Sequence, residues 1–238
     1  EAILNQIEFT GAGLPELQKE LSDLQNSGRY YDAMVNERCS NIVFWKLPKE
    51  KQVQIMEAGF WQQQPKLVHL MASTLGFRQK DALLTLDYYE DYVNASQLPL
   101  YEQGQAFLRI EDKINNLPFF HIYLHEFPIF TKVGKIHSRV MGYLKCAETA
   151  LAIERYRLKY QSLPESLGVL VPEFMDTAPI DPFDGRTLRY IQPDTGGYTL
   201  YTVGEDGVDN GGVSKKQVRE KTGESNPKEY DRPFTVRR

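Results

Sequence analysis

One long amphipathic stretch, residues 132–161, constrains the fold of this chain more than any other feature. Its apolar residues recur at intervals of three or four positions, which places them on one face of an α-helix. The members of this face are Ile136, Val140, Leu144, Ala147, Leu151 and Leu158, with Ile153 and Tyr156 widening it. A helix with so broad an apolar stripe must bury most of it. We therefore expect the remaining elements to pack around this helix.

The residues that precede the long helix are predicted to be mostly helical as well. Four leucines have helical spacing: Leu14, Leu17, Leu21 and Leu24. The same periodicity is found in residues 31–45, 79–92 and 101–117. We expect a helical region of unknown role over residues 1–131. A second region, residues 132–238, would contain the long helix and everything that follows it.

The residues after the long helix predict a small antiparallel sheet. Two alternating runs, residues 188–191 and 198–203, are separated by Pro193 and a loop with two glycines, which is typical of a β-hairpin. Residues 234–236 are expected to add a last strand. The predicted fold class is therefore α+β and mostly α, with a helical N-terminal region, a long helix and a small C-terminal antiparallel sheet.

Two further segments of the C-terminal part carry local signals. Ser162 and Glu165 form a capping-box pattern, with Pro164 placed early in a new helix, so a short helix is expected over about residues 164–170. Residues 213–229 are highly charged and poor in apolar groups. That composition predicts an extended or mobile loop.

The composition bounds the function classes. With 41% hydrophobic residues, a chain of 238 residues can bury a real core. Its net charge of −4 gives no support to nucleic acid as a partner. No apolar run approaches the ~18–20 residues that span a bilayer. The chain opens at Glu1 without a starting Met or a signal peptide, which leaves a membrane anchor upstream of Glu1 as an open expectation.

The two cysteines, Cys39 and Cys146, are too few for a disulfide framework. They are far apart in sequence and share no CxxC spacing. We interpret them as two separate, half-buried thiols, since free cysteine often serves as a small core residue. A single bridge in an oxidising compartment is the alternative.

Several short motifs from Cys146 onward occur in a recognisable order. They are residues 152–158, Leu163-Pro164-Glu165, Leu170-Val171-Pro172, Asp181-Pro182-Phe183-Asp184-Gly185, Leu188-Arg189-Tyr190 and Tyr201-Thr202-Val203-Gly204-Glu205-Asp206-Gly207. This order resembles the globular part of type II secretion major pseudopilins, over about residues 146–212 with an extension to residue 238 left open. The resemblance implies a helix-and-hairpin module and an extracytoplasmic location, either periplasmic or membrane-anchored and facing the periplasm. It does not carry filament assembly across, because Lys135, Arg139 and Lys145 make the long helix amphipathic.

An acidic glycine loop, residues 204–212, is the first candidate site. Calcium prefers six to eight hard oxygen ligands, and Asp206, Asp209 and Asn210 supply side-chain oxygens within five positions. The resemblance implies calcium here as well, with Asp206 on the family's aspartate and Asp209 or Asp231 as the later ligand. The alternative, which we favour on sequence alone, is a solvated turn in which these side chains cap their own backbone.

His121 and His125 form a second candidate, because their spacing places both rings on one helix face, as in helical zinc sites. His137 or Glu111 would have to supply a third ligand. The order of residues lacks the His-Glu-x-x-His pattern of a metalloprotease. We therefore favour the alternative, two histidines satisfied by local hydrogen bonds on an aromatic helix.

A third candidate is the run of acids and tyrosines over residues 87–92. It would either line a binding groove or offer a carboxylate pair for acid–base chemistry. An amphipathic helix with its tyrosines inside and its acids solvated is the favoured interpretation. A ligand pocket, if present, is expected to be lined by Tyr88, Tyr92, Phe119, Tyr123 and Phe127.

These observations favour a non-enzymatic, envelope-associated structural or protein-interaction protein with a pseudopilin-like C-terminal module, stabilised by Ca²⁺ if the loop binds metal. Protein partners are expected, and no catalytic motif such as Gly-x-Ser-x-Gly is found. The first alternative is a ligand-binding or sensory helical domain with an aromatic pocket. The second is a zinc-dependent hydrolase around His121 and His125.

Overall fold

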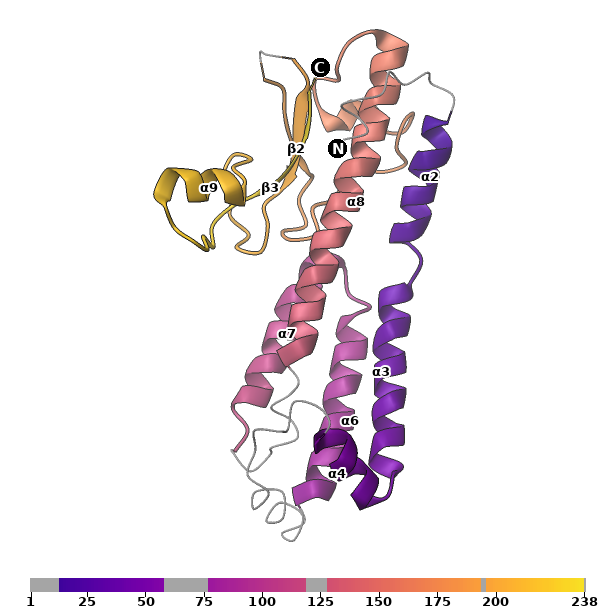
Figure 1. Cartoon of the computed structure of the whole chain (residues 1–238). Helices are drawn as coiled ribbons and strands as arrows, with labels where there is room; N and C mark the ends of the chain where they lie inside the picture. Colours follow the sequence, from indigo (N-terminus) through magenta and orange to yellow (C-terminus); the bar gives the residue numbers. More distant parts are fainter. Residues whose placement is uncertain (1–12, 58–76, 119–127, 194–195, 238) are drawn as a thin grey trace. The chain divides into compact units, whose positions relative to one another are not determined.

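The computed structural model of the chain describes residues 13–57, 77–118, 128–193 and 196–237. Its elements, in chain order, are α2 Leu14–Gln25, α3 Arg29–Lys46, α4 Lys49–Glu57, α6 Phe77–Ala95, α7 Leu100–Asn115, α8 Pro128–Tyr160, η3 Leu167–Leu170, β1 Arg189–Ile191, β2 Tyr198–Thr202, α9 Lys215–Thr222 and β3 Arg232–Val236 (Figure 1). The predicted fold class, α+β and mostly α, is confirmed. Within the described ranges, no helix combines the length and the apolar content needed to cross a bilayer.

The chain divides into two compact units. The first unit comprises Glu1–Ser27, Pro99–Glu102 and Lys135–Arg238, and the second comprises Gly28–Leu98 and Gln103–Gly134. Helix α8 contributes its first residues to the second unit and the remainder to the first. The division expected between residues 131 and 132 lies close to one of these boundaries, whereas residues 1–27 group with the C-terminal part. The predicted division at this position stays a prediction.

The sheet of the first unit has the strand order β1-β2-β3, with both pairs antiparallel. The predicted hairpin is present, with Arg189 opposite Tyr201, and the last strand pairs with its other side. Gly197 immediately precedes β2, the second strand of the hairpin, and has a φ of 79°. A Cβ at this position would lie 2.2 Å from the carbonyl oxygen of Val236, so only glycine fits between β2 and β3.

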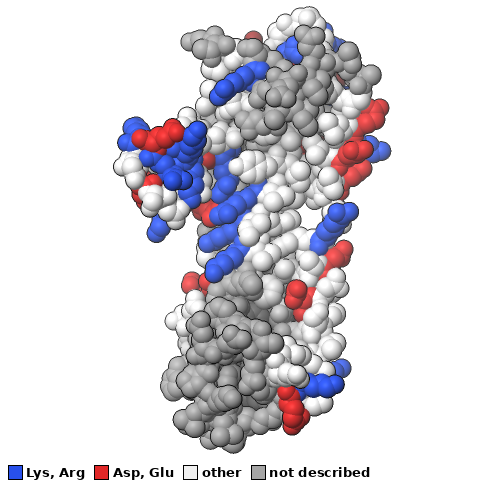
Figure 2. All heavy atoms as spheres, in the orientation of Figure 1, with Lys and Arg blue, Asp and Glu red and all other residues white. Residues whose placement is uncertain are grey.

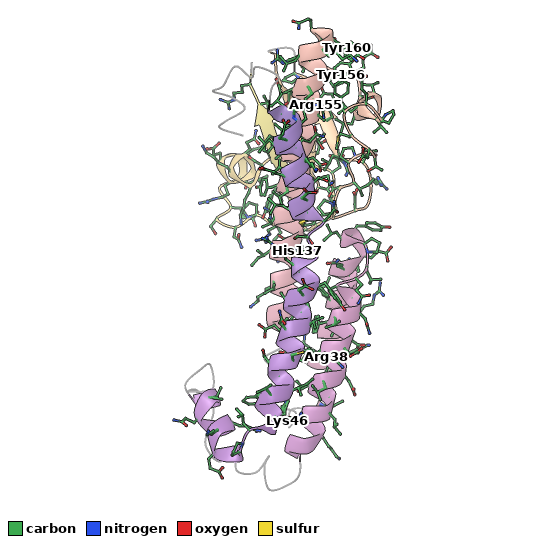
Figure 3. The ribbon with its side chains drawn as sticks, turned by 90° about the vertical axis from the view of Figure 1, so that its right-hand side faces the viewer. Arg38, Lys46, His137, Arg155, Tyr156 and Tyr160 are labelled. Atoms are coloured by element: carbon green, nitrogen blue, oxygen red, sulfur yellow. The ribbon has the colours of Figure 1, made fainter. Side chains whose placement is uncertain are left out.

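The core of the first unit lies between α8, the sheet and α2. It collects buried side chains from α8 and from the elements around it, among them Leu14, Ala150, Leu151, Ile153, Leu170, Phe174, Leu200, Phe234 and Val236. Full burial of each Leu or Ile side chain stabilises the fold by ~1.5–3 kcal/mol. A polar contact ties α2 to α8 through Arg155, which is labelled on α8 in Figure 3. Arg155 donates to Gln18 at 2.7 Å, and Gln18 donates to the Phe174 carbonyl at 2.8 Å.

A buried carboxylate joins α8 to the middle strand of the sheet. Glu154 is fully buried, and its Oε1 accepts a hydrogen bond from the Tyr198 hydroxyl at 3.2 Å. Its Oε2 accepts from Arg157 Nε at 2.8 Å. Because both oxygens are bound and a cation lies beside them, the cost of burying this charge is largely offset.

The core of the second unit is aromatic. Tyr89 and Tyr92 of α6 contact Phe130 of α8, with ring centroids 5.2 Å apart in each pair. Tyr92 also packs on Phe107 of α7, at 5.4 Å between centroids. Met34 of α3 is buried in the same cluster. The predicted helical periodicity of these segments therefore corresponds to one shared apolar interior.

Two local predictions were wrong in part. The expected helix over residues 164–170 is a short 3₁₀ helix, η3, which begins after Ser166 and has no side-chain cap. Residues 213–229 were predicted as an extended or mobile loop, yet they contain α9, whose residues are all at least partly exposed. Ser214 and Gln217 form a capping box at its start, and Gly223 ends it with a φ of 73°. Capping, not burial, therefore specifies this helix.

Candidate functional site

The acidic glycine loop closes on Asp231, the residue that precedes β3. Asp231 is only 1% exposed, and its Oδ2 accepts backbone hydrogen bonds from Asn210 at 2.9 Å and Gly212 at 2.6 Å. Its own N–H donates to the Val213 carbonyl at 2.8 Å. The carboxylate therefore holds the C-terminal end of the loop, residues 210–212, in place.

The other carboxylate oxygen of Asp231, Oδ1, is buried and has no hydrogen-bond partner among the described residues. Leaving a buried polar atom unsatisfied costs ~1–3 kcal/mol, and more for a charged group. Burial raises the pKa of Asp231, although the two backbone N–H groups oppose this, and the negative charges of Asp209 and Asp206 raise it further. A proton, a water molecule or a cation would each satisfy this oxygen.

The other three predicted ligands make mainly local hydrogen bonds. Asp206 accepts from the Val208 N–H at 3.3 Å and from the side-chain amide of Asn210 at 3.4 Å. Asp209 accepts from the Gly211 N–H at 3.0 Å. These are the bonds that the turn interpretation predicts. Among the described residues, no group of three or more His, Cys, Asp or Glu side chains is arranged to hold a metal ion.

Asp209 also belongs to a network that the sequence interpretation missed, centred on Arg189 of β1. The Tyr201 hydroxyl donates to Asp209 Oδ1 at 3.0 Å, and Arg189 Nε donates to its Oδ2 at 3.4 Å. Burial raises the pKa of Asp209, but the Gly211 N–H, Tyr201 and Arg189 outweigh this effect and lower it. Because Arg189 and Tyr201 are cross-strand partners, the register of the hairpin delivers both donors to one carboxylate.

The same guanidinium reaches the turn formed by residues 181–185. Arg189 Nη1 donates to Asp181 at 3.0 Å and to Asp184 at 3.1 Å. Asp181 is fully buried and also accepts from the backbone N–H groups of Phe183 and Val203, each at 2.9 Å. Burial raises the pKa of Asp181 to about 6, against the hydrogen bonds and the charge of Arg189. Arg189 thus connects the residue 181–185 turn to the acidic loop.

Only part of the histidine candidate lies within the described residues. His121 and His125 lie outside them, so the zinc site stays a prediction. His137 is half-buried on α8, and burial lowers its pKa (Figure 3). Glu111 lies on α7 and is partly buried.

The tyrosine–acid run over residues 87–92 matches the amphipathic-helix interpretation. Tyr89 and Tyr92 are buried in the core of the second unit, 6% and 0% exposed. The acids point outward: Glu90 pairs with Arg38 of α3 at 2.5 Å, and Asp91 pairs with a lysine of α7. Full burial removes Tyr92 from the expected lining of an open pocket. Tyr88 of α6 is half-buried. The remaining lining residues proposed there, Phe119, Tyr123 and Phe127, lie outside the described residues.

Both cysteines are free thiols, as the favoured interpretation predicts, but neither is half-buried as it expected. Cys39 is exposed on α3, and Cys146 is buried in α8. Burial raises the pKa of the Cys146 thiol well above its ordinary value, so this thiol is unreactive. Cys39 is therefore the thiol open to solvent reagents.

Comparison of the chain with protein-family models, with curated proteins and with solved structures finds no match.

Proposed function

We propose that this protein is a non-enzymatic, envelope-associated structural or protein-interaction protein whose C-terminal unit is pseudopilin-like and binds calcium. The ordered motifs between residues 146 and 212 support the proposal. So does the way the elements follow one another: a long helix, a hairpin, an acidic glycine loop and a last strand. The observation that carries the calcium part is the buried, unpartnered Oδ1 of Asp231 beside that loop.

Calcium would satisfy the chemistry of this loop. Asp231 would provide a carboxylate oxygen, and Asp206, Asp209 and Asn210 lie on the loop that Asp231 anchors. Backbone carbonyls complete calcium sites in flexible glycine loops, so the side chains alone need not form the whole ligand set. A bound cation would offset the desolvation and the mutual repulsion of the three aspartates.

Thermal unfolding with calcium and with chelator tests the calcium part. Specific binding raises the melting temperature by mass action, by the equivalent of ~2.7 kcal/mol at one hundred times the dissociation constant. Asp231→Asn is expected to abolish the shift, and Asp87→Asn, on the exposed face of α6, to leave it unchanged. No shift at millimolar calcium, or an equal shift in Asp231→Asn, rejects the site. Magnesium is the cation control.

The exposed thiol of Cys39 tests the proposed location. Producing cells with a permeabilised outer envelope are treated with a maleimide that cannot cross the inner membrane. Labelling before lysis is expected, and Cys39→Ser removes it, because Cys146 is buried. Labelling that requires complete lysis places the chain in the cytoplasm and contradicts the proposal.

A further inference from the structure

Helix α8 carries an exposed apolar ridge in the part that belongs to the first unit. Ile136, Val140 and Tyr143 are 54%, 50% and 46% exposed. Their spacing of four and three residues places them on one face of the helix, opposite the buried Ser138 and Gly142. Single exposed apolar residues are ordinary, but a contiguous set on one helix face marks an interaction surface.

Positive charge borders this ridge on one side. Arg139 of α8 and Arg232 of β3 both bind the same carboxylate oxygen of Glu205, the latter at 3.1 Å. Burial raises the pKa of Glu205, but the hydrogen bond from Arg139 and the charges of Arg139, Arg232 and Lys135 outweigh this and lower it. Arg139, Arg232 and Lys135 therefore all lie close to Glu205. Figure 2 shows uncharged surface along this part of α8, with Lys and Arg side chains gathered on the side of α9.

The part of α8 that carries the ridge supplies no balancing acid. Between Pro128 and Ala147 the sequence has no Asp or Glu, and the first acid, Glu148, is bound by Lys145 at 3.0 Å. Lys135 is exposed and has no salt bridge to an acid among the described residues. A second copy of the chain would present the same uncompensated cations, which disfavours self-association through this face.

We propose that the ridge of Ile136, Val140 and Tyr143 docks a helical segment of another protein whose apolar side is bordered by Asp or Glu. The partner's apolar side chains cover the ridge, and its acids pair with Lys135 and Arg139. This inference rests on the proposed interaction function and names the chemistry of the partner.

Designed helical peptides test the proposal on the full chain. Three peptides share one leucine stripe and carry Glu, Gln or Lys along its border, and their affinities are measured by fluorescence anisotropy. We expect the Glu peptide to bind about tenfold more tightly than the Gln peptide, to weaken at high salt, and the Lys peptide not to bind. Val140→Ser is expected to weaken binding about tenfold.

Matched variants separate the ridge from general effects. Val169→Ser alters a valine of η3 that is 46% exposed, and it is expected to bind like the parent chain. Lys135→Gln should weaken the Glu peptide but not the Gln peptide, whereas Lys19→Gln on α2 should change neither. Circular dichroism confirms that each variant folds, as expected for exposed positions.

Four outcomes overturn the inference: equal affinity for the three peptides, no binding of the Glu peptide, binding to phosphatidylcholine–phosphatidylglycerol vesicles that Val140→Ser abolishes, or self-association that the same variant abolishes.

The measurements are run with calcium and with chelator. If calcium still raises the melting temperature while the peptides fail to bind, the calcium-stabilised module stands and only the docking face is rejected. If calcium does not raise the melting temperature and the peptides bind as expected, the docking face stands and only the calcium site is rejected.

Discussion

Arg189 binds both carboxylate oxygens of Asp184, with Nη1 3.1 Å from Oδ1 and Nη2 2.5 Å from Oδ2. This two-pronged contact uses the planar fork of the guanidinium, which lysine lacks. The remaining donors reach Asp181 and Asp209. One side chain on an edge strand therefore fixes the geometry of two loops.

Replacing Arg189 is expected to destabilise the first unit strongly. Arg189→Ala leaves Asp181 and Asp184 without their cation, which costs about 3–5 kcal/mol for a buried pair. Arg189→Lys keeps the charge but loses the planar fork. Its free energy of unfolding, measured with urea, should therefore fall less than that of Arg189→Ala but still fall clearly. The control is Arg186→Lys, whose side chain is 82% exposed and lies 4.0 Å from Asp184. Equal effects of the Arg189→Lys and Arg186→Lys changes would show that the fork geometry does not matter.

Gly134 provides a packing prediction for the second unit. An added Cβ would lie 2.4 Å from Phe107 Cδ2, and Phe107 is only 1% exposed, so its ring has no room to move. Gly134→Ala should lower the free energy of unfolding by about 1–3 kcal/mol, as expected for overpacking. An alanine Cβ at Gly104 on α7 would meet open space, so Gly104→Ala should raise the free energy of unfolding by about 0.5–1 kcal/mol. Stabilisation by both changes would mean that α7 and α8 approach less closely.

The contrast between the hairpin and the Arg189 network shows where sequence reasoning succeeds. Alternation of apolar and polar residues is a local signal, and it predicted both β1 and β2 near their observed bounds. Asp181, Asp184 and Asp209 contact one guanidinium only because loops that are separated in sequence pack against each other in the fold. No local sequence pattern predicts such contacts. Asp231 is a candidate ligand only through the resemblance to pseudopilins, and the unpartnered state of its Oδ1 follows from the tertiary packing around it.

Asp231 gives the loop a pH dependence whose sign follows from its raised pKa. Without a cation, the ionised carboxylate is less favourable in the folded state than in the unfolded state. The contribution of Asp231 to folding stability is therefore fully present below its pKa of ~3.9 in the unfolded chain. It is lost as the pH rises through the higher pKa of the folded state. In chelator, Asp231→Asn should become more stable relative to the parent chain as pH rises from about 4 to neutral.

Melting temperatures across that range, measured in chelator, check this prediction. Calcium should restore the parent chain above the folded pKa and have little effect near pH 4, where protons compete for the carboxylates. A calcium response that does not depend on pH would place the ion on carbonyl oxygens alone. Asp87→Asn is again the control, because its side chain is exposed on α6.

Helix α9 is expected to depend on its caps alone. The Ser214 hydroxyl accepts from the Gln217 N–H at 3.3 Å, and the Ser214 N–H donates to Gln217 Oε1 at 2.8 Å. Ser214→Ala removes the first bond and should lower the local stability of α9 by about 1 kcal/mol. This corresponds to a roughly fivefold increase in the equilibrium constant for local unfolding of the helix. Hydrogen exchange in Lys215–Thr222 should therefore quicken by that factor while the sheet keeps its protection. Ser225→Ala, an exposed position beyond the helix, should leave exchange in α9 unchanged. If Ser214→Ala instead lowers the melting temperature of the whole chain, α9 is coupled to the sheet, and the capping account of its stability is wrong.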